Sequence, residues 1–75
     1  MTSPASPVES DPRILGGTPV FAGTRVPVQN LIDYLEAGDS LETFLTDFPA
    51  VRREQPIAAL EIAREALISS ARPAG

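Results

Sequence analysis

Apolar residues return every three or four positions in two consecutive segments of the chain, which is the spacing of a helix with one buried face. The first face consists of Val28, Leu31, Ile32 and Leu35, and the second of Leu41, Phe44, Leu45 and Phe48. Gly38 follows the first segment and Pro49 follows the second, and both residue types end helices. The pattern predicts two short helices joined by a tight turn, with Asp39 or Ser40 capping the second.

A third helical segment covers "REQPIAALEIAREALI", residues 53–68. Because proline is accepted in the first turn of a helix and rejected in its interior, Pro56 predicts that regular hydrogen bonding starts near Gln55. The apolar residues form a face of Ala59, Leu60, Ala63 and Leu67 bordered by Ala66, with Ile57 and Ile68 on one flank and Ile62 on the other. This arc is wider than a three-helix core requires. It predicts either a broadly buried helix or a partner-binding surface that uses Ile57, Ile62 and Ile68.

Glycine and proline are concentrated in "GGTPVFAGTRVPV", residues 16–28, just before the first helix. Val20-Phe21 and Arg25-Val26 are short extended runs on either side of Gly23, which supplies the positive φ that a tight turn requires. Two strands of this length are unstable alone. The segment therefore predicts a short β-hairpin that packs on a helix or pairs with another chain.

The edge of this hairpin is a candidate contact surface, because an exposed strand edge pairs readily with another strand. Val20, Phe21 and Arg25 are therefore candidates for binding a second copy of the chain or a different protein. Arg25 has a second interpretation, in which its guanidinium ties the hairpin to carbonyl oxygens at a helix end or to a carboxylate such as Asp33 or Glu36.

The ends of the chain differ in composition from its middle. Residues 1–10 contain three serines and two prolines, which predicts a disordered arm. We expect one domain over residues 11–68 and a frayed tail over residues 69–75. Residues 1–10 lack the pattern of a signal peptide, and no stretch reaches the roughly 18–20 apolar residues of a membrane span. We therefore expect a cytoplasmic protein without membrane contact.

Composition limits the chemistry that the chain can perform. All six basic residues are arginine, and histidine, lysine and cysteine are missing from the sequence. Imidazole bases, thiolates and the usual nitrogen and sulfur metal ligands are therefore absent. We expect no catalytic residue, no metal or other cofactor and no small-molecule substrate. The formal net charge of −4 disfavours nonspecific attraction to nucleic acid or anionic lipid and favours a basic partner.

The order of the helices predicts a mainly α fold: a three-helix, helix-turn-helix-like domain preceded by the short β-hairpin. In this interpretation the third helix reads DNA, and Arg52, Arg53 and Gln55 lie at its N-terminal end, with side chains that can bond to bases or phosphates. The alternative is that the adjacent arginines are ordinary solvated residues. The charged residues of 33–47 are all acidic, which indicates either a solvated face or a docking face for a basic protein.

The sequence resembles the small bacterial proteins of the domain-of-unknown-function 433 family over residues 11–67. The resemblance is carried by "GGTPVFAGTRVPV", by the helix that ends at Ala37-Gly38, and by "SLETFLTDFP" and "AALEIA", in that order. It implies a helix-turn-helix-like domain that acts as the antitoxin beside a PIN-like ribonuclease toxin. Such an antitoxin binds the toxin directly and represses its own operon through operator DNA.

Two positions depart from the family pattern where the third helix begins. Relatives often have serine or threonine where this chain has Arg52, and a branched aliphatic residue where it has Pro56. These two departures do not disturb the expected toxin-binding surface. They change the start of the third helix, where the expected DNA contacts lie. Two hypotheses follow: a homodimeric antitoxin that also binds DNA, and a protein-interaction module without DNA binding.

Overall fold

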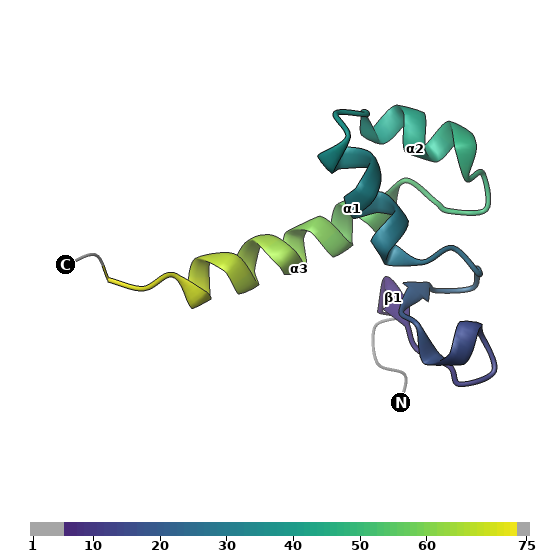
Figure 1. Ribbon diagram of the computed structural model, residues 1–75, viewed down its shortest axis with the longest axis horizontal. Helices are drawn as coiled ribbons and strands as arrows, with labels where there is room; N and C mark the ends of the chain where they lie inside the picture. The colour runs from purple at the N-terminus through teal and green to yellow at the C-terminus, as the bar shows by residue number, and fades with distance from the viewer. Residues whose placement is uncertain (1–5, 74–75) are drawn as a thin grey trace.

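The computed structural model describes residues 6–73 and confirms the expected class, three helices preceded by a small antiparallel hairpin (Figure 1). The elements are strand β1 (Val8–Glu9), a 3-10 turn (Leu15–Gly17), strand β2 (Val20–Phe21), helix α1 (Val28–Glu36), helix α2 (Leu41–Asp47) and helix α3 (Glu54–Ser70). The ordered elements thus begin before the expected boundary at residue 11 and continue past residue 68. The first five residues of the expected arm lie outside the described residues.

The strand that pairs with β2 is not the one expected. β2 pairs with β1, in the register Val8 to Phe21 and Glu9 to Val20, whereas Arg25-Val26 forms no strand. On that side, the N–H of Phe21 donates a hydrogen bond to the carbonyl of Val26 (3.0 Å), next to an isolated bridge between Val20 and Pro27. Because Pro27 has no N–H, the ladder cannot continue through it.

The hydrophobic core lies between the hairpin and the first two helices. Phe21, Leu31, Phe44 and Val51 are buried together, and the rings of Phe21 and Phe44 are 5.9 Å apart. Tyr34 meets Phe44 edge-on at 5.5 Å. Because so few side chains are buried, the core of the domain contributes only a small stabilisation.

The helix ends follow the local signals of the sequence. Gly38, at φ +89°, lies just past α1, where the N–H of Asp39 donates to the carbonyl of Tyr34 (2.9 Å). This is the left-handed C-terminal cap that glycine favours. The Ser40 hydroxyl caps α2 by accepting the N–H of Thr43 (3.1 Å). Pro56 lies in the first turn of α3, where its missing N–H leaves no bond unmade.

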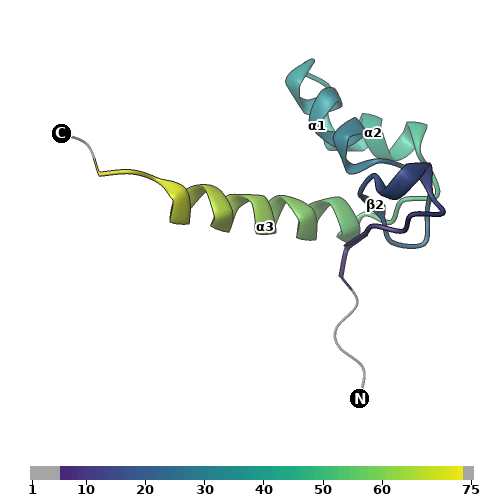
Figure 2. The same cartoon turned by 60° about the horizontal axis from the view of Figure 1, so that its bottom comes forward.

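Helix α3 leaves the body of the protein after its first turns. Figures 1 and 2 show it projecting alone from the side of the hairpin and of α1 and α2. Pro56 is buried and Leu60 is half-buried, whereas every residue from 61 to 70 is exposed. The third helix is therefore neither broadly buried nor part of a closed three-helix bundle, and half of it contacts none of the other described elements.

Candidate functional site on helix α3

The side chain of Gln55 bonds the first turn of α3 to the turn that follows β2. The Oε1 atom of Gln55 accepts the N–H of Arg52 (2.9 Å), and the N–H of Gln55 donates to the Arg52 carbonyl (3.0 Å). The Nε2 atom of Gln55 donates to the carbonyl of Ala22 (2.9 Å). Both polar atoms of the Gln55 amide are therefore engaged inside the protein. The predicted role of Gln55 as a DNA contact conflicts with this geometry, because a two-point contact to a base would compete with these bonds.

Arg53 is paired with a carboxylate of α2. Its Nη2 donates to Oε1 of Glu42 (2.7 Å), and its Nη1 donates to Oε2 of the same carboxylate. The side-chain hydrogen bond from Arg53 lowers the pKa of Glu42 below its ordinary value of 4.5. Both side chains are exposed, so the pair contributes little to stability and can open. In the structure, however, the Glu42 carboxylate neutralises the positive charge of Arg53.

Arg52 is the predicted DNA contact whose charge stays open to solvent. Its side chain is 80% exposed and lies 3.8 Å from the carboxylate of Glu54. Arg52 also lines an open hollow of about 580 Å³ between the hairpin turn and the start of α3, together with Gly23 and Ala58.

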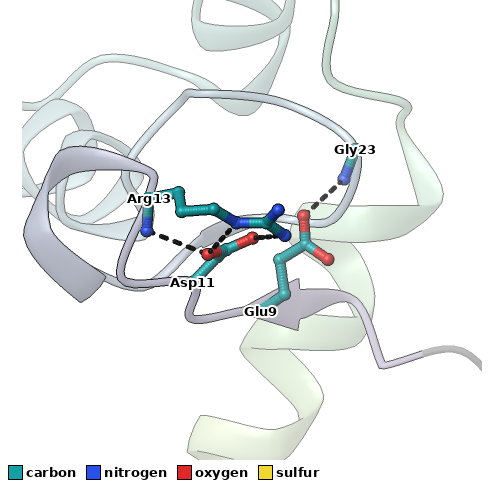
Figure 3. A network of polar contacts seen from close by, with 4 residues as sticks. All are labelled: Glu9, Asp11, Arg13 and Gly23. Atoms are coloured by element: carbon teal, nitrogen blue, oxygen red, sulfur yellow. Dashed lines mark hydrogen bonds and ion pairs between the residues drawn. The ribbon is translucent and has the colours of Figure 1, made fainter.

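Figure 3 shows from close by the polar contacts around the turn at residues 22–24, which follows β2, and in the loop after β1. The Glu9 carboxylate accepts the N–H of Gly23 (3.1 Å), which ties β1 to the turn after β2. Beside it, Arg13 donates to Asp11 through Nε (3.2 Å) and Nη2 (3.0 Å). The side-chain hydrogen bond from Arg13 holds the pKa of Asp11 below its ordinary value of 3.8. The Glu9 contact therefore holds the turn against β1, whereas the pair of Arg13 and Asp11 is local to the loop after β1.

The predicted contact role of the hairpin strand is wrong for Val20 and Phe21. Both side chains are fully buried, and β2 is bonded along both edges, so no edge of β2 is open to another chain. Because two residues carry no periodic signal, the pairing of residues 8–9 with β2 could not be predicted from the sequence. Arg25 is exposed, and within residues 6–73 its guanidinium has no hydrogen bond or ion pair, so the predicted tie to Asp33 or Glu36 is absent there.

The exposed half of α3 carries the predicted isoleucines and a further apolar seam. The exposed fractions are 41% for Ile57, 55% for Ile62, 71% for Leu67 and 63% for Ile68. At about 100° per residue, Leu60, Ala63, Leu67 and Ser70 fall on one line, which we call the α3 seam, with Ala59 and Ala66 beside it. Ile57 and Ile68 lie on one flank of the seam, and Ile62 lies on the other. Large exposed apolar side chains gathered on one element mark an interaction surface.

The acidic residues of α1 and α2 divide into paired and free groups. Asp47 accepts the Tyr34 hydroxyl (2.6 Å), and this bond raises the pKa of Tyr34 above its ordinary value of 10.0. Asp33 accepts from the Gln29 amide (2.9 Å). Glu36 and Asp39 are exposed near the turn between α1 and α2. Within the described chain, no three carboxylates gather closely enough to hold a metal ion.

A small helical body, a hairpin clamped onto it and a projecting third helix define the class of this protein. The chain belongs to the family described as protein of unknown function (DUF433), whose model matches residues 8–63 and so includes β1. It is 48% identical over 48 residues to a Sinorhizobium fredii (strain NBRC 101917 / NGR234) protein named "Uncharacterized protein y4eO". That match covers 64% of this chain and 22% of the relative, so the chain spans less than a quarter of the relative's length. No solved structure matches the chain.

Among the helices of residues 6–73, none has the length and apolarity needed to cross a membrane.

Proposed function

We propose that the protein is the antitoxin of a bacterial toxin-antitoxin pair and that it neutralises a PIN-like ribonuclease by direct binding. The observation that carries this proposal is the exposed half of α3, where Ile62, Leu67 and Ile68 project from the body of the protein. Large apolar side chains exposed around a projecting helix are suited to burial against another protein. The family resemblance supplies the identity of the partner.

Charge supports the same type of partner. The chain carries a formal net charge of −4, and the exposed carboxylates of Glu36 and Asp39 stand at one end of the body. A ribonuclease that binds RNA carries basic residues, so the acidic antitoxin is attracted to it over distance and then held by apolar contact.

DNA binding is the second candidate activity, and Arg52 favours it. Its guanidinium is solvent-exposed at the start of the helix that a helix-turn-helix protein places against DNA. Arg53 joins it only if the pair with Glu42 opens. The alternative function is a protein-interaction module that does not bind DNA.

The proposal is tested by co-expressing the chain with the protein encoded by the neighbouring gene. We expect the two to copurify as a complex of defined mass and the chain to restore growth of cells that express the neighbour. Ile68→Asp tests the surface, because it places a charge among the exposed apolar residues of α3, and we expect it to abolish copurification and growth rescue. Thr46→Asp, a change at an exposed position of α2 outside this surface, should leave both intact. A chain that neither copurifies nor restores growth would refute the antitoxin role for that neighbour.

A further inference from the structure

We propose that the α3 seam is the contact surface between two copies of this chain, paired as antiparallel helices. This inference goes beyond the proposed function and does not depend on it, because it concerns the protein without its toxin. The seam consists of Leu60, Ala63, Leu67 and Ser70, flanked by Ala59 and Ala66.

The protein already packs against the beginning of the same line of residues. Pro56, one turn before Leu60 on that line, is fully buried, and Ala59 and Leu60 are packed against the core cluster. The positions 56, 60, 63, 67 and 70 are spaced alternately by four and three residues, which is the spacing of a seam between two helices. Beyond Leu60 the seam continues, but the body of the protein has ended (Figure 2). A second helix is the natural cover for the remaining part.

The second half of the seam is open to a partner. Residues 61–70 are all exposed, and Leu67 on the seam is 71% exposed. A second copy can therefore lie along this part of the helix.

Charge selects the seam as the surface for a second copy. Two copies of a chain of net charge −4 repel each other, and the face of α1 and α2 that holds Glu36 and Asp39 would bring like charges together. The positions of the seam itself hold no charged residue, and Arg64 lies beside it on the flank opposite Ala66. The seam is therefore a surface on which two copies can meet without burying a charge.

Side-chain size sets the direction of the pairing. In an antiparallel pair, Leu67 of one copy faces Ala63 of the other, and Leu60 faces Ser70, so each large residue meets a small one. In a parallel pair, leucine would meet leucine and alanine would meet alanine, which leaves gaps between the alanines. Ala59 and Ala66 allow the two helices to approach closely.

The test is sedimentation equilibrium of the isolated chain with Leu67→Asp and its neighbour Ile68→Asp as a matched pair. Both changes place the same charge at an exposed position of one helix, but only Leu67 lies on the seam. We expect the unchanged chain and Ile68→Asp to reach twice the mass of one chain, and Leu67→Asp to raise the dimer dissociation constant at least about 100-fold. Equal effects of the two changes, or a monomer for the unchanged chain at all concentrations, would overturn the proposal.

A cysteine introduced into a chain that has none tests the direction. Ala66 lies next to the two-fold axis of the antiparallel pair, so Ala66→Cys should form a disulfide-linked dimer on mild oxidation, as its Cα atoms come within the range of a disulfide. Ala58→Cys, remote from the axis, should remain reduced. Failure of Ala66→Cys to cross-link would overturn the antiparallel arrangement. Because no toxin is present in either experiment, loss of dimerisation and loss of toxin binding are distinguished.

Discussion

The amide of Gln55 donates a hydrogen bond of 2.9 Å to the carbonyl of Ala22 and thereby fixes the start of α3 to the hairpin turn. The two residues are 33 positions apart in the sequence. The same amide also accepts the N–H of Arg52, just before the helix. One side chain therefore ties the first turn of α3 both to the residue that precedes the helix and to the turn at residues 22–24.

Replacing Gln55 with alanine should lower the free energy of unfolding by about 1–2 kcal/mol, because it leaves the Ala22 carbonyl and the Arg52 N–H without their partner. Gln55→Glu should also be destabilising, since its carboxylate still accepts the Arg52 N–H but places a second acceptor against the Ala22 carbonyl. Urea denaturation followed by circular dichroism measures both. Gln29→Ala, at an exposed position of α1, is the control and should change stability by less than about 0.5 kcal/mol. Equal stability of Gln55→Ala and the control would show that the clamp is unimportant.

Gly23 should resist substitution because of its backbone conformation rather than for lack of space. Its φ is +77°, and a Cβ at this position would meet no atom within 4 Å. We expect Gly23→Ala to cost about 1–2 kcal/mol, and Gly23→Asn to cost less, because asparagine adopts the left-handed conformation more readily. Thermal unfolding of the two variants checks the order. If alanine were tolerated as well as asparagine, the turn would have to adopt another conformation in solution.

The core is small enough for one truncation to unfold the protein. Phe44 is fully buried and contacts Phe21, Tyr34 and Phe48. Truncation of a buried phenylalanine to alanine costs about 3–5 kcal/mol, which approaches the whole stability of a domain of this size. Far-ultraviolet circular dichroism of Phe44→Ala should show loss of helix, whereas Leu15→Ala, at an exposed position, should keep it. A folded Phe44→Ala would mean that the core is larger than the monomer shows, as it would be if a partner added to it.

The ion pair between Arg53 and Glu42 should be lost in acid, when the Glu42 carboxylate is protonated. The pKa of Glu42 is lowered in the folded protein, so the pair stabilises the fold above the ordinary pKa of 4.5, and this contribution is lost as the pH falls through the lowered value. A nuclear magnetic resonance titration of the Glu42 carboxyl carbon measures the pKa directly. In Arg53→Gln the pKa should rise towards its ordinary value. An unchanged pKa in that variant would show that the pair does not form in solution.

DNA binding, if the protein has it, should depend on the two arginines in different ways. Arg52→Glu should weaken operator binding strongly, because it reverses a solvent-exposed charge. Glu42→Gln should strengthen it, because it releases Arg53 from its carboxylate. Electrophoretic mobility shift at two salt concentrations checks both. If neither variant alters binding, or if no binding exists, the protein-interaction module is the better description.

The sequence could predict those features that are fixed by neighbouring residues. Gly38, Ser40 and Pro56 each mark a helix end through a local rule of backbone geometry, and the structure confirms all three. The turn at Gly23 follows for the same reason. Such signals act within one turn of chain, so they are visible without knowledge of the fold.

Features that depend on distant residues could not be predicted in this way. Nothing in the composition of residues 1–10 indicates that Val8–Glu9 would pair with β2, whose two side chains are fully buried. The amphipathic pattern of α3 was visible, but the sequence could not show where the body of the protein ends along it. The pairing of Arg53 with Glu42 also joins two different helices, and no spacing rule within one helix identifies it.

Because α3 projects from the body of the protein, any partner that binds its exposed half must also stabilise the helix there. Residues 61–70 lie beyond the body, so only the helix's own backbone bonds hold them, and a helical stretch this short is marginal in water. Their amide protons should exchange with solvent rapidly in the free chain and slowly once the seam is covered, while those of Leu31 and Phe44 report global unfolding. Part of the binding free energy is therefore used to form the helix. A partner that contacts only part of α3 should bind with lower affinity than one that contacts its full length.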